Sequence, residues 1–394
     1  MITSMIDTDL YKLTMMQAVF HQFPNTVVKY EFKCRNKGIN FEPIMQYLDA
    51  EIDAIRQLQF TIGELNYLAT LPFFKKDFID YLFGYRNNHN SVKSYIDNSG
   101  DLKIDIRGTW LNTVLLEVPI LAAVNETYFT NGKSAAEIGE LFHDGAERLL
   151  GKVEAIKRDG VLGHRTLKVV EFGTRRRFSH DRQNLVLETM SKALPETLVG
   201  TSNLFFAKKF NLNPIGTHAH EWFMAHQALV RIEDSQKVAL QNWASEYRGH
   251  LAIALSDTLG IDAFLRDFDL YFAKLYDGVR QDSGEPMDIY HKVVAHYRKL
   301  GIDPKTKTMV FSDGLTVDKA IEINKNTPEI NSIFGIGTSL TNDIVSEPLQ
   351  IVMKLTECNG HPVAKISEAR GKTMCNDPVY LGYLKNIFNI KETK

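Results

Sequence analysis

The sequence has little cysteine, no large net charge and no long apolar run. Its 394 residues include three cysteines, Cys34, Cys358 and Cys375, and no two of them form a CxxC pair. This spacing argues against a structural zinc site and against a disulfide framework, and it indicates reduced thiols. The formal net charge of −2 gives no overall basic field that would attract nucleic acid.

Segments that direct a chain to a membrane are missing as well. No uninterrupted apolar run approaches the ~20 residues of a membrane span. The first ten residues contain acids and no apolar stretch of the kind found in signal peptides. We therefore expect a soluble, cytoplasmic protein without a membrane or nucleic-acid partner. Low-complexity linkers are also absent, so a domain boundary has to be inferred from a change of pattern.

What is present is the composition of an ordinary globular protein, 44% hydrophobic and 24% charged, with enough residues for two domains. Strand and helix patterns alternate in the first part of the chain. They predict a strand at 26–35, a helix at 41–58, a hairpin at 91–110 and a helix at 113–129. Pro119 is expected to kink or break the last of these. Residues 1–134 are thus predicted to form a mixed α+β domain.

From residue 135 the chain repeats one pattern: a short apolar run, a turn rich in small polar residues, then an amphipathic helix. The segments are 167–179, 196–206, 213–223, 251–265, 276–286, 307–320 and 332–343. Such alternation implies an α/β fold with parallel strands joined by helices. About seven units over 135–350 favour an irregular, TIM-like (β/α) barrel, and an open sheet is the alternative. We expect residues 351–394 to pack back on the N-terminal domain.

The polar turns follow the carboxyl ends of the predicted strands, where α/β folds place their active sites. We therefore expect one mouth to be lined by residues from successive turns. These are Arg175, Ser202, His220, Asp257, Asp282, Asp313 and Gly337.

Three consecutive arginines, 175–177, stand in "FGTRRRFS" at one of these strand ends. Guanidinium groups bind carboxylate or phosphate in a bidentate manner, so the segment predicts an anionic ligand. A solvated basic turn is the alternative interpretation. Consecutive residues cannot all point inward, and we expect one or two of the three to serve structure.

Two aspartates occupy similar turns, Asp282 in "VRQDSGEP" and Asp313 in "FSDGLT". Carboxylates in such turns bind sugar hydroxyls or a magnesium ion, although Asp-Gly is also ordinary turn chemistry. The segment "FGIGTSL", residues 334–340, offers backbone N–H groups for a phosphate. The chain contains no GxxxxGK[ST] and only part of a GxGxxG motif, which argues against a P-loop or a Rossmann cofactor.

The stretch "NPIGTHAHEWFMAHQ", residues 213–227, contains three histidines. If it begins as a strand, His218 and His220 share one face, and His226 lies on the following helix, where a structural role is expected. A zinc site would need a third ligand, and no HExxH motif or cysteine partner supplies one. A histidine among arginines and aspartates is better placed for nucleophilic or acid–base chemistry.

Taken together, these motifs resemble the nicotinate phosphoribosyltransferase family, a type II phosphoribosyltransferase family. The resemblance covers nearly the whole chain and rests on nine short strings in the family's order. They are "DTDLYK" (7–12), "YEFKCR" (30–35), "LPFFK" (71–75), "EFGTRRRFS" (171–179), "VGTSN" (199–203), "GTHAHEWF" (216–223), "VRQDSGEP" (279–286), "VFSDGL" (310–315) and "FGIGT" (334–338).

The resemblance implies an enzyme of NAD salvage that joins nicotinate to phosphoribosyl pyrophosphate and releases pyrophosphate. It implies that ATP drives the reaction through a phosphorylated histidine, which motif alignment places at His220, with His218 as a neighbour. Phe172 would stack on the pyridine ring and Arg175 would hold its carboxylate. Ser202 stands where the related nicotinamide enzymes carry an aspartate, which would repel that carboxylate.

The resemblance assigns the other site residues in two groups. Tyr11, Asp9 and Arg35 would complete the pocket, in related enzymes from the neighbouring subunit. Ribose, phosphate and Mg²⁺-pyrophosphate would be bound by Asp282, Asp313, Arg280, Gly335, Gly337 and Thr338, with Lys354 and Lys365 as further phosphate contacts. A homodimer with a shared site and a monomer that covers its own mouth both fit this pattern.

The chemistry fits these residue types. Breaking the bond from ribose C1 to pyrophosphate develops positive charge, which Asp282 or Asp257 could stabilise. The leaving pyrophosphate needs Mg²⁺ or basic side chains. The alternatives are quinolinate or nicotinamide phosphoribosyltransferase activity, a zinc hydrolase, and a non-catalytic scaffold, which we expect to lack charged residues such as Arg175 and His220 at the strand ends.

Overall fold

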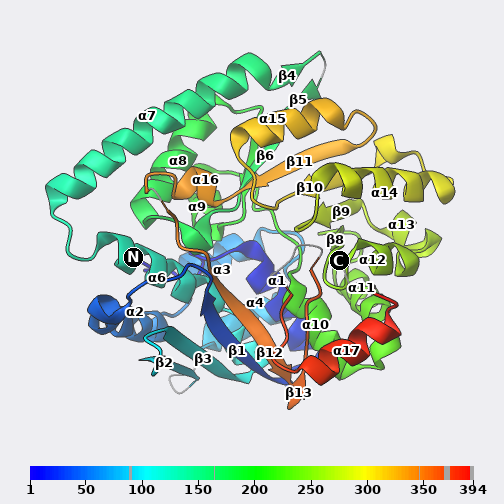
Figure 1. The fold of residues 1–394 in the computed structure, drawn as a ribbon, viewed down its shortest axis with the longest axis horizontal. Helices are drawn as coiled ribbons and strands as arrows, with labels where there is room; N and C mark the ends of the chain where they lie inside the picture. The colour runs from blue at the N-terminus through cyan, green and yellow to red at the C-terminus, as the bar shows by residue number, and fades with distance from the viewer. Residues whose placement is uncertain (88–90, 164, 346, 368–372, 391–394) are drawn as a thin grey trace.

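The computed structural model describes residues 1–87, 91–163, 165–345, 347–367 and 373–390, and it contains two main sheets. In Figure 1 an antiparallel sheet lies below a parallel sheet, and helices surround both. None of the described helices is both long and apolar enough to cross a bilayer.

The antiparallel sheet has the strand order β13-β12-β1-β3-β2. Its strands are β1 (Val27–Cys34), β2 (Val92–Ile96), β3 (Leu102–Thr109), β12 (Ile351–Cys358) and β13 (His361–Pro362). Burial alternates along β1, because its apolar side chains face the core while Lys29, Glu31 and Lys33 point to the other face. The predicted strand at 26–35 and the hairpin at 91–110 are confirmed.

Helices of the N-terminal part fill the space around this sheet. They are α1 (Leu10–Gln22), α2 (Met45–Gln57), α3 (Ile62–Ala69), α4 (Lys76–Gly84), α5 (Trp110–Thr113) and α6 (Glu117–Thr130). The helix expected at 113–129 is interrupted, but not at Pro119. The interruption lies between α5 and α6, and Pro119 stands in the first turn of α6, where its missing N–H has no intrahelical partner to lose.

The parallel sheet has the order β7-β6-β11-β10-β9-β8. Its strands are β6 (Val169–Glu171), β7 (Leu198–Thr201), β8 (Ile253–Leu255), β9 (Gly278–Gln281), β10 (Thr308–Phe311) and β11 (Asn331–Ile336). The predicted α/β class with parallel strands is therefore confirmed. A closed barrel is not confirmed, because no ladder joins β7 to β8 within the described residues.

One of the seven expected strands did not form. Residues 213–219 make a single bridge from Pro214 to Thr201 and otherwise run irregularly up to α10 (His220–Leu229). Pro214 has no N–H for a ladder, and a Cβ at Gly216 would lie 3.2 Å from the backbone nitrogen of Tyr11. The close approach of α1 replaces the strand and brings the N-terminal segment to the end of the parallel sheet.

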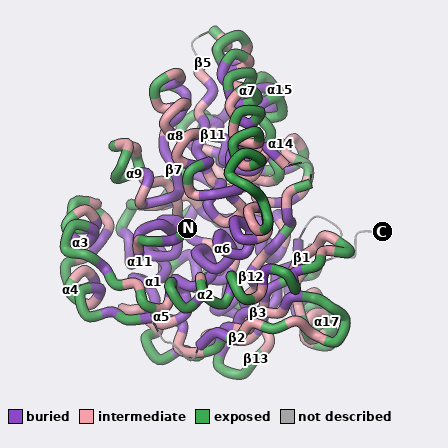
Figure 2. The backbone as a smooth tube through the Cα atoms, turned by 90° about the vertical axis from the view of Figure 1, so that its left-hand side faces the viewer, coloured by how far each residue is buried: buried purple, intermediate pink, exposed green. Residues whose placement is uncertain are grey.

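The remaining helices mostly join successive parallel strands. They are α7 (Ala135–Asp159), α8 (His180–Ala193), α9 (Leu204–Phe210), α11 (Ser235–Tyr247), α12 (Ile261–Asp267), α13 (Leu270–Leu275), α14 (Pro286–Lys299), α15 (Val317–Asn326) and α16 (Thr338–Thr341), with the short strands β4 (Val161–Leu162) and β5 (Arg165–Thr166) after α7. Figure 2 shows buried backbone in the middle of the molecule around α6 and exposed backbone along α7. Nearly every residue of α6 is buried, as its all-round apolar sequence requires.

The C-terminal segment contacts both parts of the molecule. β12 pairs with β1 from Cys34↔Ile351 to Val28↔Cys358, which makes it a strand of the N-terminal sheet. α17 (Pro378–Ile387) instead packs its Leu384 with Leu259 and Ala263 of the parallel-sheet half. The segment therefore links the two halves. The residue limits of the domains, 1–134, 135–350 and 351–394, stay a prediction.

Candidate active site

A cleft of about 700 Å³ opens at the carboxyl ends of the parallel strands, between α1 and β12. It brings together residues that lie far apart in the sequence. Of the expected site residues it is lined by Tyr11, Arg35, Phe172, Arg175, His220, Arg280, Asp282, Asp313, Gly335, Gly337, Thr338, Lys354 and Lys365. Asp9, Ser202 and Asp257 lie behind this lining.

His220 is the first residue of α10 and lies between two carboxylates. Its Nε2 is 3.0 Å from Oδ1 of Asp257, and its Nδ1 is 3.8 Å from Oδ2 of Asp282. Asp282 in turn accepts from Nη2 of Arg280 at 3.1 Å, and Arg280 lies in β9, where it pairs with Leu255 of β8 and Val310 of β10. The helix start and two neighbouring strand ends therefore hold this group in place.

Asp257 has both carboxylate oxygens occupied. Oδ1 faces His220, while Oδ2 accepts from the Ser283 hydroxyl at 2.6 Å and lies 3.1 Å from Nζ of Lys365. Burial raises the pKa of the carboxyl, but His220 and Lys365 outweigh burial and hold that pKa below its ordinary range. Asp257 is therefore an anion that only accepts hydrogen bonds.

The same surroundings keep His220 neutral. Burial lowers the pKa of its imidazole, the Lys365 charge lowers it further, and the opposing effect of Asp257 is smaller. Because the Asp257 carboxylate can only accept, the ring proton lies on Nε2. Nδ1 then carries a lone pair on the side of the ring that faces Asp282.

The three arginines separate into different roles, as expected. Arg177 is fully buried and binds both oxygens of Asp7 at 2.8 Å. Arg176 lines the cleft and donates from Nε to the carbonyl oxygen of Ile351 at 2.9 Å, which ties the turn to β12. Arg175 lines the cleft, with Glu117 at 3.7 Å and Asp9 at 4.0 Å as its nearest carboxylates. Among the described residues it has no closer acceptor, so its donors are available to a ligand.

Phe172 packs against two glycines at the end of β11, Gly335 within the strand and Gly337 just after it. A Cβ at Gly335 would lie 2.4 Å from the Phe172 ring, and a Cβ at Gly337 would lie 2.9 Å from the Phe172 carbonyl oxygen. Both positions therefore require glycine, because any side chain would collide with Phe172. This packing leaves the Phe172 ring and the turn at 337–339 exposed to the same cleft.

A metal site at His220 has the right residue types, since ligand atoms of His220, Asp257 and Asp282 lie within 4.8 Å of one another. The missing third ligand was therefore the wrong reason to reject zinc. The better reason is that Lys365 and Ser283 already occupy Oδ2 of Asp257, and His220 occupies Oδ1. Asp282 lines the cleft, and its Oδ1 accepts from Arg280 at 3.1 Å and from the Ser312 hydroxyl at 2.8 Å.

Comparisons with known proteins agree over the whole chain. Residues 167–392 match the nicotinate phosphoribosyltransferase family, and residues 6–125 match the N-terminal domain of that family. The chain belongs to the nicotinate phosphoribosyltransferase family.

Individual relatives cover the full length. A nicotinate phosphoribosyltransferase from Cupriavidus necator is 48% identical over 394 residues, with 99% of each chain covered. A crystal structure of the Vibrio cholerae nicotinate phosphoribosyltransferase has 41% identity and a TM-score of 0.94, covering 100% of this chain and 95% of its own. A putative one from Saccharomyces cerevisiae has 32% identity and a TM-score of 0.90, with 99% of each chain covered.

In this member of the nicotinate phosphoribosyltransferase family, one chain supplies the N-terminal residues of its own cleft. Tyr11 of α1 and Arg35 after β1 line the same cleft as His220. The backbone N–H of Leu10 bonds to the Ser202 carbonyl oxygen at 2.7 Å, which fixes the start of α1 against the parallel sheet. No second chain is needed to bring these groups together.

Asp9 and Ser202 bind each other rather than facing the cleft. The Ser202 hydroxyl donates to Oδ1 of Asp9 at 2.7 Å, and both side chains are buried. Oδ2 of Asp9 is the oxygen that lies 4.0 Å from Arg175. The structure thus places this pair behind Arg175 and not among the residues that line the cleft.

His218 and His226 are both buried outside the cleft. His226 bonds the Trp222 carbonyl oxygen at 2.7 Å and Asn242 at 3.1 Å, in agreement with its expected structural role. His218 packs edge-on between Phe223 and Trp243, and burial lowers its pKa to about 3. The expectation that His218 and His220 share a strand face is wrong, because His220 begins a helix.

Sequence reasoning missed a buried ion cluster beneath the cleft. Lys12 is fully buried and contacts Glu117, at 2.5 Å, and Glu221. Glu221 also accepts from the Tyr30 hydroxyl and from the Trp110 indole N–H, at 3.1 and 3.0 Å. The cluster joins α1, α6 and the residue after His220. The strings "DLYK" and "HE" drew attention to Lys12 and Glu221 separately, but nothing in the sequence indicated that the two residues contact each other.

Two further polar residues were missed. Glu171, at the end of β6, is buried and accepts from Thr201 at 2.6 Å and Gln183 at 2.9 Å, so it supports the turn that carries Phe172. Asn342 lines the cleft beside the turn at 337–339 and is fully buried, yet neither amide atom has a partner among the described residues. Such an orphaned amide is costly unless a ligand or water bonds it.

Proposed function

We propose that this protein is an ATP-dependent nicotinate phosphoribosyltransferase that works through a phosphohistidine at His220. It would form nicotinate mononucleotide and pyrophosphate from nicotinate and phosphoribosyl pyrophosphate. The observation that carries the proposal is a neutral histidine, held by Asp257, in a cleft whose other walls offer an aromatic ring and free cations.

Nicotinate would lie on the Phe172 ring with its carboxylate on Arg175. Both groups line the cleft next to Tyr11, and the Arg175 donors have no acceptor closer than 3.7 Å. A carboxylate fits two parallel guanidinium N–H groups, whereas a carboxamide offers one acceptor and brings two donors of its own. Charge and geometry at Arg175 therefore favour the acid over nicotinamide.

The phosphoribosyl group would lie between the turn at 337–339 and the β9–β10 strand ends. Backbone N–H groups of that turn and the orphaned Asn342 amide suit the 5′-phosphate, and Asp313 suits the ribose hydroxyls. Arg280, Arg35 and Lys354 supply positive charge for pyrophosphate. Bound Mg²⁺ would neutralise further charge on that leaving group, held through the pyrophosphate and the Asp282 side.

His220 would accept the γ-phosphoryl group of ATP on Nδ1. The Nδ1–P bond forms as the bond from phosphorus to the ADP oxygen breaks, and ADP leaves with that oxygen. Asp257 keeps the proton on Nε2 and stabilises the positive charge that the ring develops. After product formation, water would take the phosphoryl group and restore the imidazole.

The phosphoryl group would change the charge of the cleft by about two units, by analogy with other phosphorylated side chains. It would stand near Arg280, which now pairs with Asp282, and near Lys365, which now pairs with Asp257. We expect these cations to turn toward the phosphoryl group, so that ATP hydrolysis alters affinity for the substrates.

Turnover with three pyridines tests the substrate assignment. Nicotinate, nicotinamide and quinolinate are each offered with phosphoribosyl pyrophosphate, with and without ATP, and mononucleotide is measured. The proposal predicts turnover of nicotinate that ATP stimulates, and kcat/KM for nicotinamide lower by at least about 100-fold, the cost of leaving a charged donor unpaired. Equal use of nicotinamide contradicts the role of Arg175, and quinolinate turnover indifferent to ATP contradicts the whole proposal.

A further inference from the structure

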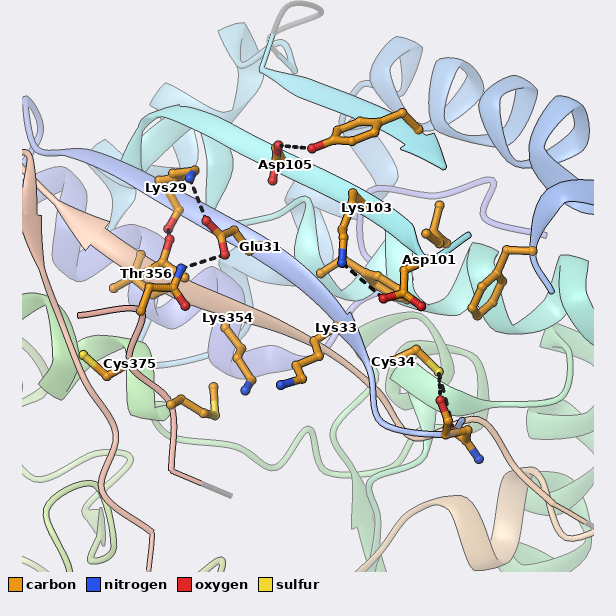
Figure 3. A pocket seen from close by; sticks show the side chains of 18 of the residues that line it. Lys29, Glu31, Lys33, Cys34, Asp101, Lys103, Asp105, Lys354, Thr356 and Cys375 are labelled. Atoms are coloured by element: carbon orange, nitrogen blue, oxygen red, sulfur yellow. Dashed lines mark hydrogen bonds and ion pairs between the residues drawn. The ribbon is translucent and has the colours of Figure 1, made fainter. Parts of the chain in front are cut away.

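A second cavity, of about 530 Å³, lies on the polar face of the antiparallel sheet (Figure 3). Side chains of β1, β3 and β12 form its floor, and residues 373–376 form one wall. Lys354 lines both this cavity and the active-site cleft, so the two spaces share a wall. The proposed reaction uses Lys354, at the shared wall, as a contact for pyrophosphate, and it uses none of the residues that line only the second cavity.

Four lysines line the cavity, and only two of them are neutralised. Lys29 pairs with Glu31 at 2.6 Å, and Lys103 lies 3.5 Å from Asp101. The side-chain ammonium groups of Lys33 and Lys354 form no ion pair or hydrogen bond with any residue in the part of the chain that the structure describes. The unpaired charges therefore gather at one end of the cavity.

The two unpaired lysines reach the same point. Figure 3 shows their side chains extending into the cavity with the ammonium groups beside each other. Their register explains this, because Lys354 pairs with Glu31 and therefore shares its face with Lys33, two residues along β1. Burial lowers the pKa of Lys354 to about 8, and the charges of Arg35 and Lys33 add to that effect.

Two unpaired ammonium groups side by side repel each other unless an anion lies between them. The acids of the cavity do not serve this purpose, since Glu31 is held by Lys29 and by the Asn376 amide at 2.8 Å. Phosphate carries up to two charges at neutral pH and accepts from compact ammonium donors at several oxygens.

We propose that the second cavity binds a small ligand through a phosphate group held between Lys33 and Lys354. The cavity is larger than one phosphate and has apolar lining from Ile39, Phe41 and Met374, so it has room for an organic group as well. Because Lys354 also faces the active-site cleft, the bound phosphate changes the charge available there. Binding at this site does not depend on the proposed activity.

Protection of lysines from acetylation tests the site directly. The full-length protein is treated briefly with acetic anhydride at constant ionic strength, and modification of Lys33, Lys354 and Lys93 is measured by mass spectrometry. Lys93 is an exposed lysine of β2 that does not line the cavity. Inorganic phosphate and AMP are the probes, and sulfate-free chloride at matched ionic strength is the blank.

The proposal predicts that a probe slows acetylation of Lys33 and Lys354 at least tenfold and leaves Lys93 unchanged. Equal protection by both probes assigns free phosphate as the ligand, while protection by AMP at a tenfold lower concentration assigns a nucleotide. Unchanged acetylation of Lys33 with both probes overturns the proposal. So does equal slowing at Lys93, since that would reflect a general salt effect.

A charge reversal gives an independent test. Lys33→Glu is expected to abolish the protection of Lys354, while the matched Lys93→Glu retains it. Lys33 does not line the active-site cleft, but a carboxylate beside Lys354 would draw that lysine away from pyrophosphate, so nicotinate mononucleotide formation is followed in wild type without added phosphate. If wild type showed no turnover but its Lys33 and Lys354 were still protected, the result would count against the proposed function alone. Protection of Lys354 that survives Lys33→Glu would count against this site alone.

Discussion

Nε2 of His220 lies 3.0 Å from Oδ1 of Asp257, and the other oxygen of that carboxylate is held by Lys365 and Ser283. Lys365 and Ser283 therefore hold the carboxylate in the orientation in which it contacts the histidine. This orientation matters because an imidazole can act as a nucleophile only if one nitrogen keeps the proton and the other presents its lone pair. Asp257 accordingly acts on His220, while Asp282 faces the cleft.

Asp257→Asn should slow phosphorylation of His220. An amide at this position can present N–H to Nε2, which favours the wrong tautomer, and it leaves Lys365 without its carboxylate. We expect the initial rate of label transfer from ATP to fall by roughly 10²–10⁴-fold. Asp267→Asn is the matched control, because Asp267 is a buried aspartate that binds Gln236. If Asp257→Asn were labelled at the wild-type rate, Asp257 would not orient the His220 ring.

The pH dependence of phosphorylation follows from the lowered pKa of His220. Its ordinary value is 6.5, and burial with the Lys365 charge moves the pKa below that value, so the neutral ring persists into mildly acidic solution. The rate of rapid-quench labelling should therefore decline toward acid pH with a midpoint below pH 6.5. Lys365→Met removes a positive charge, raises the pKa of His220 and should move the decline to higher pH. An inflection above 6.5 in wild type would contradict this electrostatic picture.

Arg175 and Arg177 should respond to alanine in opposite ways. Arg175→Ala removes unpaired donors from the cleft and should raise KM for nicotinate by about 10- to 100-fold, with unfolding unchanged. Arg177→Ala leaves Asp7 buried without its partner and should lower the free energy of unfolding by roughly 3–5 kcal/mol. Steady-state kinetics and urea unfolding of both variants check the contrast. The contrast would be contradicted if Arg175→Ala raised KM for nicotinate only together with a loss of stability like that of Arg177→Ala.

The location of Tyr11 predicts how two defective chains behave together. Tyr11 and His220 line one cleft of one chain, so a Tyr11→Ala, Arg35→Ala chain and a His220→Asn chain should not restore activity when they are refolded together. If the N-terminal segment served a neighbour, random mixed dimers would regain roughly a quarter of wild-type activity. Turnover of the mixture measured against each chain alone distinguishes the two arrangements.

Local patterns were sufficient for much of the fold. Alternation along 26–35 and the Gly100 turn predict β1 and the β2–β3 hairpin, because apolar residues at every second position fit a half-buried strand and not a helix. The small polar turns also predict which residues meet, since parallel strands end at one edge. Asp282, Asp313 and Gly337 lie in the same cleft for that reason.

Contacts between distant segments could not be predicted in this way. Lys12 and Glu221 are 209 positions apart, and their pairing depends on how α1 seats against the end of the parallel sheet. The same seating turns residues 213–219 away from a strand and sends Ser202 to Asp9 instead of the cleft. Each of these outcomes is decided by tertiary packing and not by the local sequence.

The central claim is that His220 carries the phosphoryl group, and transfer of label from γ-³²P-ATP tests it most directly. Wild type, His220→Asn and His218→Asn are compared, with mononucleotide formation followed in parallel. The account predicts acid-labile label in wild type and His218→Asn, no label in His220→Asn, and loss of ATP stimulation in that variant only. Label retained by His220→Asn would contradict the account, since another residue would then be the phosphoacceptor.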